Sequence, residues 1–266
     1  MKMADLVVLK IGGSVLTKKS LDKAEIDYSN LARISSEIKN AQDKGKFSLV
    51  VVHGAGPFGH IPVKEYGLDK VFKGVDQLAG VVKTRQMMQK LNLKVVESLN
   101  KAGLYTVAFQ PSAAGLLSDG ILCDFRLDLI ERFLSIGVVP VCYGDLLLDE
   151  KRGVAVLSGD ILAPYLALKL KAEMVVLAAD VRGIYSADPA VDVKAEFIPK
   201  LSIKDIDGID LTGSRSTDVT GGMKGKIRAL KDAANQDVEI QVISGIEPGF
   251  VEKALLGEHV GTKIKP

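Results

Sequence analysis

Short apolar runs alternate with longer amphipathic segments along this chain. The runs are rich in Val, Ile and Leu and lack the regular alternation of a half-exposed strand, so they predict strands buried on both faces of a sheet. They lie at residues 6–11, 48–53, 105–109, 137–143, 173–179 and 239–244. The amphipathic segments predict helices. They cover residues 28–44, 75–102, 127–136, 161–171, 224–235 and 248–256.

This order of elements is typical of α/β proteins with a mostly parallel central sheet covered by helices. Two polar turns between apolar runs, SDGI from Ser118 and DEKRG from Asp149, predict hairpins. A third polar stretch, DVRGIYSADP from Asp180, predicts a hairpin or a loop. The sequence has no repeat, low-complexity tract or Pro/Ser linker, so we expect a single domain over residues 1–266. Within this domain, a weak boundary near residue 170 separates an N-terminal part from a C-terminal part.

Composition and charge narrow the choice of partners. The 266 residues, 47% of them hydrophobic, are enough for a sizeable core, and with 5% aromatic residues and no Trp that core is expected to be aliphatic. Lys and Arg number 35 against 33 Asp and Glu, a net charge of +2. Without a basic block, nucleic acid is not expected as a partner.

Targeting signals and cysteine usage point to the cytoplasm. The N-terminal apolar run continues into a glycine turn without a cleavage site, which favours a core strand over a signal peptide. No run approaches the ~20 apolar residues of a membrane span. Cys123 and Cys142 stand apart in apolar surroundings, which predicts buried free thiols in a reducing compartment. We therefore expect a soluble, cytoplasmic protein with no membrane partner.

The glycines of GAGPFG, from Gly54 to Gly59, match the spacing of a dinucleotide-binding turn. In such a turn the last glycine leads directly into a helix. Pro57 and Pro62 argue against that helix, and so against NAD. A glycine loop after a buried strand still suits a phosphate. His60 at its end is a candidate donor to a phosphate oxygen, with a solvent-facing loop histidine as the alternative.

Two more glycine loops carry lysines. After the first apolar run, Gly12, Gly13 and Ser14 offer backbone donors beside Lys10 and the Lys18–Lys19 pair. Near the predicted helix at 224–235 lie the glycines and lysines of TGGMKGKI: Gly221, Gly222, Lys224, Gly225 and Lys226. Each loop alone fits an ordinary turn with solvated lysines. Together with the loop at Gly54–Gly59, they favour phosphate binding over ordinary turns.

Carboxylates follow two other apolar runs. In SGD, Ser158 is a predicted helix cap, Gly159 allows close approach of a ligand, and Asp160 falls in the first helical turn. Asp160 either stabilises that helix or holds ammonium groups in position. Asp180 ends a predicted strand where α/β sheets bind ligands, and Tyr185 is a candidate for packing on a flat base. Ordinary turn chemistry is the alternative for Asp180.

Taken in order, these segments resemble the amino acid kinase family, which includes acetylglutamate, carbamate, aspartate and uridylate kinases. The resemblance covers almost the whole chain. It rests on KIGGS at Lys10, VVHGAGPFG at Val51, SGD at Ser158, LAADVRGIYSADP at Leu177 and TGGMKGKI at Thr220. Within the family, the chain resembles the isopentenyl phosphate kinases because the second glycine loop ends in His60 and LTKKS follows the first. Fosfomycin kinases and nucleotide monophosphate kinases are the nearest alternatives.

The resemblance implies a three-layer αβα sandwich that forms a homodimer. It further implies a kinase of isoprenoid biosynthesis, in the mevalonate pathway, that transfers a phosphoryl group from ATP with Mg²⁺ to isopentenyl phosphate. The acceptor would lie over residues 1–170 and ATP over residues 171–266. No protein ligand to a metal is expected. A regulatory nucleotide-binding protein without turnover is the alternative from another class.

Residue roles also come from the resemblance. It implies that Lys10 and Lys226 contact transferring or leaving phosphate oxygens, that Lys19 reaches the transferring group, that His60 holds the acceptor phosphate, and that Asp160 orients Lys10. The implied acceptor cradle is Ala55, Gly56, Gly59, His60 and Gly159. The implied ATP contacts are Lys10, Gly12, Gly13, Ser14, Gly56, Asp180, Tyr185, Gly222 and Lys226. The helical stretch from Val81, which follows the second glycine loop and contains Met87 and Met88, is a candidate wall for an apolar acceptor tail. Core packing is the alternative for each methionine.

Overall fold

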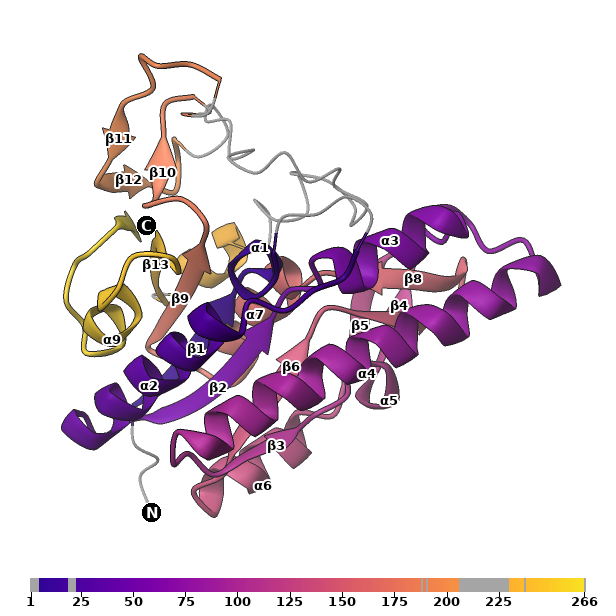
Figure 1. Ribbon diagram of the computed structural model, residues 1–266, viewed down its shortest axis with the longest axis horizontal. Coiled ribbons are helices and arrows are strands. Elements are labelled where there is room, and N and C mark those ends of the chain that lie inside the picture. Colours follow the sequence, from indigo (N-terminus) through magenta and orange to yellow (C-terminus); the bar gives the residue numbers. More distant parts are fainter. Residues whose placement is uncertain are drawn as a thin grey trace.

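The computed structural model describes residues 5–18, 23–187, 189, 191–205, 230–236 and 238–265. Its main sheet has eight strands: β1 (Leu6–Ile11), β2 (Ser48–His53), β3 (Thr106–Ala108), β6 (Val139–Tyr143), β9 (Met174–Ala179), β12 (Lys200–Ser202), β13 (Glu239–Ser244) and β14 (Thr262–Lys265). Their spatial order is β12-β14-β13-β9-β1-β2-β6-β3 (Figure 1). Only the β13–β14 pair is antiparallel. The predicted mostly parallel sheet is confirmed.

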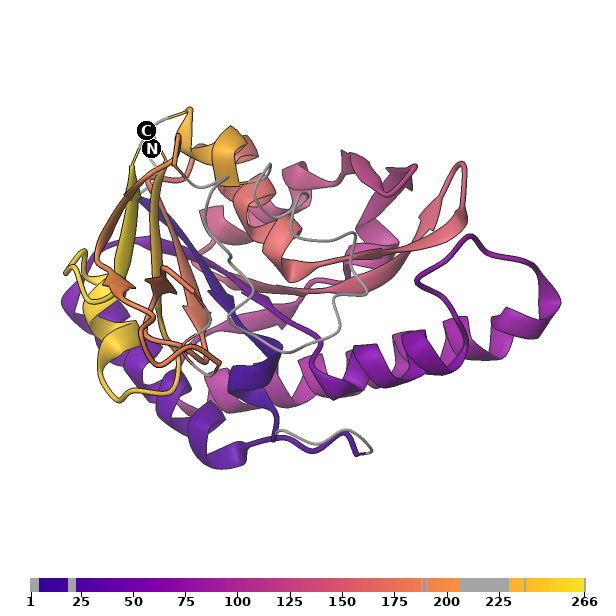
Figure 2. The same ribbon diagram turned by 90° about the horizontal axis from the view of Figure 1, so that it is seen from above.

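Helices cover both faces of this sheet, as Figure 2 shows from above. Helices α2 (Tyr28–Lys44), α4 (Leu78–Lys101) and α9 (Phe250–Leu255) pack on one face. Helices α6 (Leu127–Ser135) and α7 (Gly159–Lys169), together with the helical residues 230–234, pack on the other. The chain therefore forms the three-layer αβα sandwich that the resemblance implies.

A smaller four-stranded sheet lies beside the main one. It consists of β4 (Gly115–Ser118), β5 (Ile121–Phe125), β7 (Asp145–Asp149) and β8 (Gly153–Leu157), in the order β5-β4-β7-β8. Both predicted hairpins are present, since β4 pairs with β5 and β7 with β8 in antiparallel fashion. The turn at Asp119 and Gly120 has positive φ at both residues, as a two-residue hairpin requires. In the described part of the stretch after Asp180, β10 (Ile184–Tyr185) pairs in antiparallel fashion with β11 (Phe197–Ile198).

One prediction is wrong at β5. Cys123 lies on this strand and is exposed, as are Ile121 and Asp124, because the described residues do not cover these side chains. Cys142, in the middle of β6, is buried as predicted. Both thiols are free, and burial raises the pKa of Cys142.

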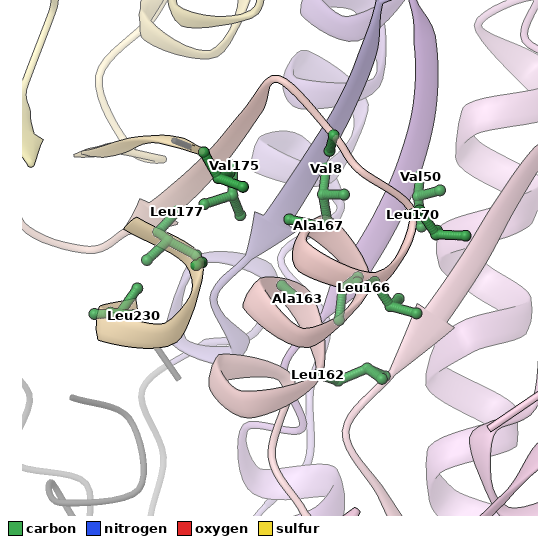
Figure 3. Close-up of a cluster of buried hydrophobic side chains, with 14 of the residues drawn as sticks. Val8, Val50, Leu162, Ala163, Leu166, Ala167, Leu170, Val175, Leu177 and Leu230 are labelled. Atoms are coloured by element: carbon green, nitrogen blue, oxygen red, sulfur yellow. The ribbon is translucent and has the colours of Figure 1, made fainter. Parts of the chain in front are cut away.

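The two layers of the core follow from alternation along the strands. In β1, Leu6 and Val8 face α7, while Val7, Leu9 and Ile11 face α2 and α4. Figure 3 shows how α7 fills the first layer between β1, β2 and β9. Its contact residues are Leu162, Ala163, Leu166, Ala167 and Leu170, packed near Val8, Val50, Val175, Leu177 and Leu230. This packing holds the start of α7 at the carboxyl end of β1.

The glycine turn after β2 differs from the sequence prediction. A helix, α3 (Pro57–Glu65), begins directly after Gly56. Pro57 does not oppose the helix, because it occupies the first helical position, where no backbone donor is needed. Pro62 is accommodated within the helix. The described residues also form three short elements: α1 (Gly13–Leu16), the 3₁₀ turn η1 (Val75–Gln77) and α5 (Pro111–Ala114).

None of the helices in the described ranges combines the length and the apolar composition needed to cross a lipid bilayer.

Candidate active site

Four parallel strands, β1, β2, β6 and β13, are each followed directly by a glycine at the same edge of the main sheet. Their N–H groups each donate to a carbonyl at the end of a neighbouring strand and so extend the sheet by one hydrogen bond. The pairs are Gly12 with Ala178 (2.8 Å), Gly54 with Ile11 (2.8 Å), Gly144 with His53 (2.9 Å) and Gly245 with Ala179 (2.6 Å). The loops therefore leave the sheet side by side, at the edge where α/β sheets bind ligands.

The loops after β1 and β2 interlock. A Cβ atom on Gly13 would lie 2.2 Å from the backbone nitrogen of Gly56, so no side chain fits at residue 13. Gly56 has φ of +51° and caps the start of α3. A Cβ there would also lie 2.6 Å from the hydroxyl of Thr17. Glycine is required at both positions, once for space and once for backbone conformation as well.

The interlocked loops present backbone donors. Among the described residues, the N–H groups of Gly13, Ser14, Ala55 and Gly56 have no hydrogen-bond acceptor. Gly12 does not belong to this set, because the sheet already uses its N–H. The nest expected at Gly12, Gly13 and Ser14 thus supplies two donors, and the second loop supplies two more. Several converging N–H groups form a typical anion site.

Lys10 and Asp160 meet at this edge. Lys10 shares a face of β1 with Leu6 and Val8, which is the face that α7 covers. Ser158 caps α7 as predicted, by accepting a hydrogen bond of 3.1 Å from the Asp160 N–H. The Lys10 Nζ lies 2.5 Å from Asp160 Oδ1, with the two side chains 11% and 30% exposed. A largely buried ammonium is thereby held at the same sheet edge as the glycine loops, with its counter-charge at a helix N-terminus.

The predicted acceptor residues gather around the start of α3. His60 lies in its first turns, half-buried, and its N–H donates to the Gly56 carbonyl at 3.0 Å. A Cβ on Gly59 would lie 2.6 Å from that of Ala55, so Gly59 lets the loop fold tightly onto the helix. Gly159 approaches the same loops, since its Cβ would lie 3.2 Å from the His53 carbonyl. Met88 is a buried core residue, and Met87 packs partly against the same core.

His53 is a residue that the sequence analysis missed. It ends β2 beside Tyr143 of β6, and their rings stack with centroids 5.4 Å apart. Its side chain is fully buried, and its Nδ1 lies 2.9 Å from the Gly54 carbonyl oxygen. Burial lowers the pKa of the imidazole to about 4, so the ring is neutral at neutral pH. The only available signal was one polar residue at the end of an apolar run.

A second buried polar group lies near His53. Asp145, the first residue of β7, accepts hydrogen bonds from the backbone N–H groups of Ser112 (3.1 Å) and Leu146 (2.8 Å). Burial raises the pKa of its carboxyl group, and the charge of Arg85 on α4 opposes that change. Burial, followed by the nearby Asp145 charge, raises the pKa of the Tyr143 hydroxyl. Asp145 lies two residues beyond Tyr143, whose ring stacks on His53.

Side chains of helix α2 form hydrogen bonds with the segments that follow β1 and β13. Asn30 donates to the carbonyl oxygens of Val15 (2.7 Å) and Gly245 (3.2 Å), which belong to different loops. Arg33 also donates to Gly245 and forms an ion pair with Glu37. The buried Glu37 carboxylate in turn accepts from the Gly249 N–H, at the start of α9. Sequence analysis missed this network as well.

The C-terminal side of the site is partly described. Asp180 follows β9 directly, half-buried, at the same edge as the glycine loops. Tyr185 lies on β10, where its ring meets that of Phe197 edge-on at 5.6 Å. Lys19, Gly222 and Lys226, together with Gly221, Lys224 and Gly225, lie outside the described residues.

Comparisons with known proteins agree with this architecture. The model of the amino acid kinase family matches residues 5–244. The isopentenyl phosphate kinase of Methanothermobacter thermautotrophicus is 40% identical over 97% of this chain and 98% of its own, and that of Methanocaldococcus jannaschii is 35% identical over 97% and 98%. A crystal structure of an isopentenyl phosphate kinase matches 97% of this chain and 100% of its own, with 36% identity and a TM-score of 0.83. The chain belongs to the amino acid kinase family and is similar to its isopentenyl phosphate kinases over nearly its whole length.

Proposed function

We propose that this chain is a kinase that transfers the γ-phosphoryl group of ATP to isopentenyl phosphate, giving isopentenyl diphosphate and ADP. The observation that carries the proposal is the Lys10–Asp160 ion pair at the sheet edge from which the two interlocked glycine loops leave with open N–H groups. This arrangement suits the transfer of a group between two phosphates. The similarity to isopentenyl phosphate kinases supports the choice of acceptor.

The proposed reaction needs no protein base. An oxygen of the acceptor phosphate is already an anion, so it attacks the γ-phosphorus directly. The bond from that phosphorus to the bridging oxygen breaks, and its electron pair stays on ADP. Catalysis then depends on alignment and on neutralising the charge of the phosphates. Lys10 supplies positive charge at the transferring group and Asp160 orients it, while Lys19 and Lys226 are proposed to add further charge.

The proposed nucleotide position is the C-terminal side of the sheet edge, near Asp180 and Tyr185. This keeps the expected division into an acceptor part (residues 1–170) and a nucleotide part (residues 171–266). In the described part of the chain, His, Cys, Asp and Glu side chains do not form a group of three or more that suits a metal. Mg²⁺ would therefore take its ligands chiefly from nucleotide phosphates and water, as it commonly does in kinases. Assembly as a homodimer stays a prediction.

The first experiment is an acceptor panel with Mg-ATP. We expect preferential phosphorylation of isopentenyl phosphate over dimethylallyl phosphate, fosfomycin, UMP, carbamate and acetylglutamate, measured by ATP consumption and product mass. Turnover of another acceptor alone would keep the phosphoryl chemistry and overturn the substrate. If ATP binds but no acceptor is converted, a regulatory nucleotide-binding role replaces the proposal.

His60→Ala tests the acceptor side. Removing a hydrogen bond to a charged group costs about 1.5–3 kcal/mol, so the KM for the acceptor is expected to rise roughly 10–150-fold. The KM for ATP should change little, because His60 is proposed to bind the acceptor phosphate and not ATP. His259→Ala is the matched control, since His259 is an exposed histidine that contacts the Pro199 carbonyl away from the glycine loops. An unchanged acceptor KM and kcat in folded His60→Ala protein would refute this role.

A further inference from the structure

The fully buried ring of His53 makes a single hydrogen bond within the described residues. Its Nδ1 lies 2.9 Å from the carbonyl oxygen of Gly54, the next residue along the chain. Its Nε2 is buried and has no partner in that same part of the chain. A buried polar atom without a partner costs stability, which an aliphatic side chain at the end of β2 would avoid. The contact at Nδ1 is therefore the feature to explain.

The partner of Nδ1 fixes the tautomer of the ring. A carbonyl oxygen only accepts hydrogen bonds, so the neutral imidazole must carry its proton on Nδ1. Nε2 is then left with its lone pair. The low pKa of the buried ring keeps this neutral form across the neutral pH range.

The contact also orients the next peptide group. The described chain has no cis peptide bonds, and in a trans peptide the carbonyl of one residue and the N–H of the following residue point in opposite directions. Because His53 holds the Gly54 carbonyl, the Ala55 N–H must point away from the imidazole. That N–H is one of the donors without an acceptor in the described structure.

We infer that His53 is a positioning residue: its Nδ1–H holds the Gly54 carbonyl and thereby aims the Ala55 N–H at the phosphate of the acceptor. This inference rests on the proposed function for the identity of the acceptor. Stacking on Tyr143 and burial in the layer beneath α4 fix the ring itself. The orientation of the Ala55 N–H therefore depends on His53, whose side chain is not proposed to touch the substrate.

Two substitutions separate the hydrogen bond from the packing. His53→Phe keeps an aromatic ring for Tyr143 and removes the donor. His53→Asn places an amide N–H near the position of Nδ1. Loss of one donor to an anion predicts a KM for isopentenyl phosphate at least about tenfold higher in His53→Phe, with the KM for ATP unchanged. His53→Asn is expected to retain most of the acceptor affinity. An unchanged acceptor KM in folded His53→Phe, or equal loss in both variants, would overturn the inference.

Nuclear magnetic resonance provides a test that does not depend on turnover. Long-range ¹H–¹⁵N correlations on the wild-type protein should place the His53 proton on Nδ1. Titration with inorganic phosphate should shift the Ala55 amide resonance, and His53→Phe should weaken this response. A proton on Nε2, or an Ala55 resonance that ignores phosphate, would refute the role of His53. If the wild-type protein converts no isopentenyl phosphate but both signals are as expected, the proposed substrate fails and the positioning role stands.

Discussion

Lys10→Ala is expected to lower kcat by two to three orders of magnitude while the protein stays folded. The ammonium is largely buried at the sheet edge from which the glycine loops leave, where the proposed reaction would accumulate charge as the phosphoryl group moves. Removing one such preorganised donor typically raises the barrier by about 2.7–4 kcal/mol, a 10²–10³-fold loss of rate. Asp160 is 30% exposed, so its carboxylate remains hydrated when Lys10 is replaced. Steady-state turnover of isopentenyl phosphate, with circular dichroism to verify folding, measures the effect.

The matched control is Lys94→Ala. Lys94 is also an ion-paired lysine, with its Nζ 2.8 Å from Glu97, but both side chains are exposed on α4. Its removal should leave kcat unchanged, because exposed pairs contribute little. Asp160→Asn should lower kcat by less than Lys10→Ala, since the ammonium remains and only its orientation weakens. Wild-type turnover in folded Lys10→Ala protein would contradict the proposed role of Lys10.

Gly13→Ala is expected to disable the site by separating its two loops. The added methyl group would meet the Gly56 backbone nitrogen at 2.2 Å and its Cα at 2.8 Å. Backbone atoms have no alternative rotamer, so the loops themselves must move. Overpacking of this kind costs about 1–3 kcal/mol of stability. A shift of about 1 Å in a reacting group costs roughly 100-fold in rate. We therefore expect kcat/KM to fall at least that far, together with a lower melting temperature.

Gly45→Ala controls for the loss of a glycine. Gly45 follows the end of α2, and the nearest neighbours of a methyl group there would be the side chains of Phe47 and Leu256, at 3.0–3.2 Å. Those side chains can turn aside, so activity should stay near that of the wild type. If Gly13→Ala were as active as Gly45→Ala, the close contact between the two loops would not matter for catalysis.

The elements that the sequence predicted well are those that a single stretch of residues determines. All six predicted strands are present, because runs such as LVVLKI are apolar on both faces and fit only the middle of a covered sheet. The helix predicted over residues 28–44 has the observed limits, since Asp27 caps its start and Gly45 follows its end. The same local chemistry predicted Ser158 as the cap of α7.

The errors have equally local causes. The prediction that Pro57 and Pro62 argue against a helix in this loop is wrong, because Pro57 occupies the helical position that tolerates proline best. Cys123 was expected in the core because its neighbours are apolar. The sequence does not reveal that three of the five side chains of β5 are exposed in the folded chain.

The contacts that hold the site together were out of reach for another reason. Asn30 donates hydrogen bonds to Val15 and to Gly245, and Gly245 lies 215 residues beyond Asn30 along the chain. No periodicity or motif links such distant positions, and Asn30 looks like any polar residue at the start of a helix. Likewise, the tautomer of His53 depends on one carbonyl oxygen that only the folded loop brings to it.

The place of β1 between β2 and β9 has a consequence for the growing polypeptide. On the ribosome, β1 can pair with β2 as soon as residue 53 has emerged, but its other edge faces β9, which begins at Met174. Until then the central strand of the finished sheet is an edge strand, with unpaired N–H and C=O groups that other chains can engage. Synthesis of residues 174–179 closes that edge and, in the same step, completes the carboxyl end of the sheet at which Lys10 stands.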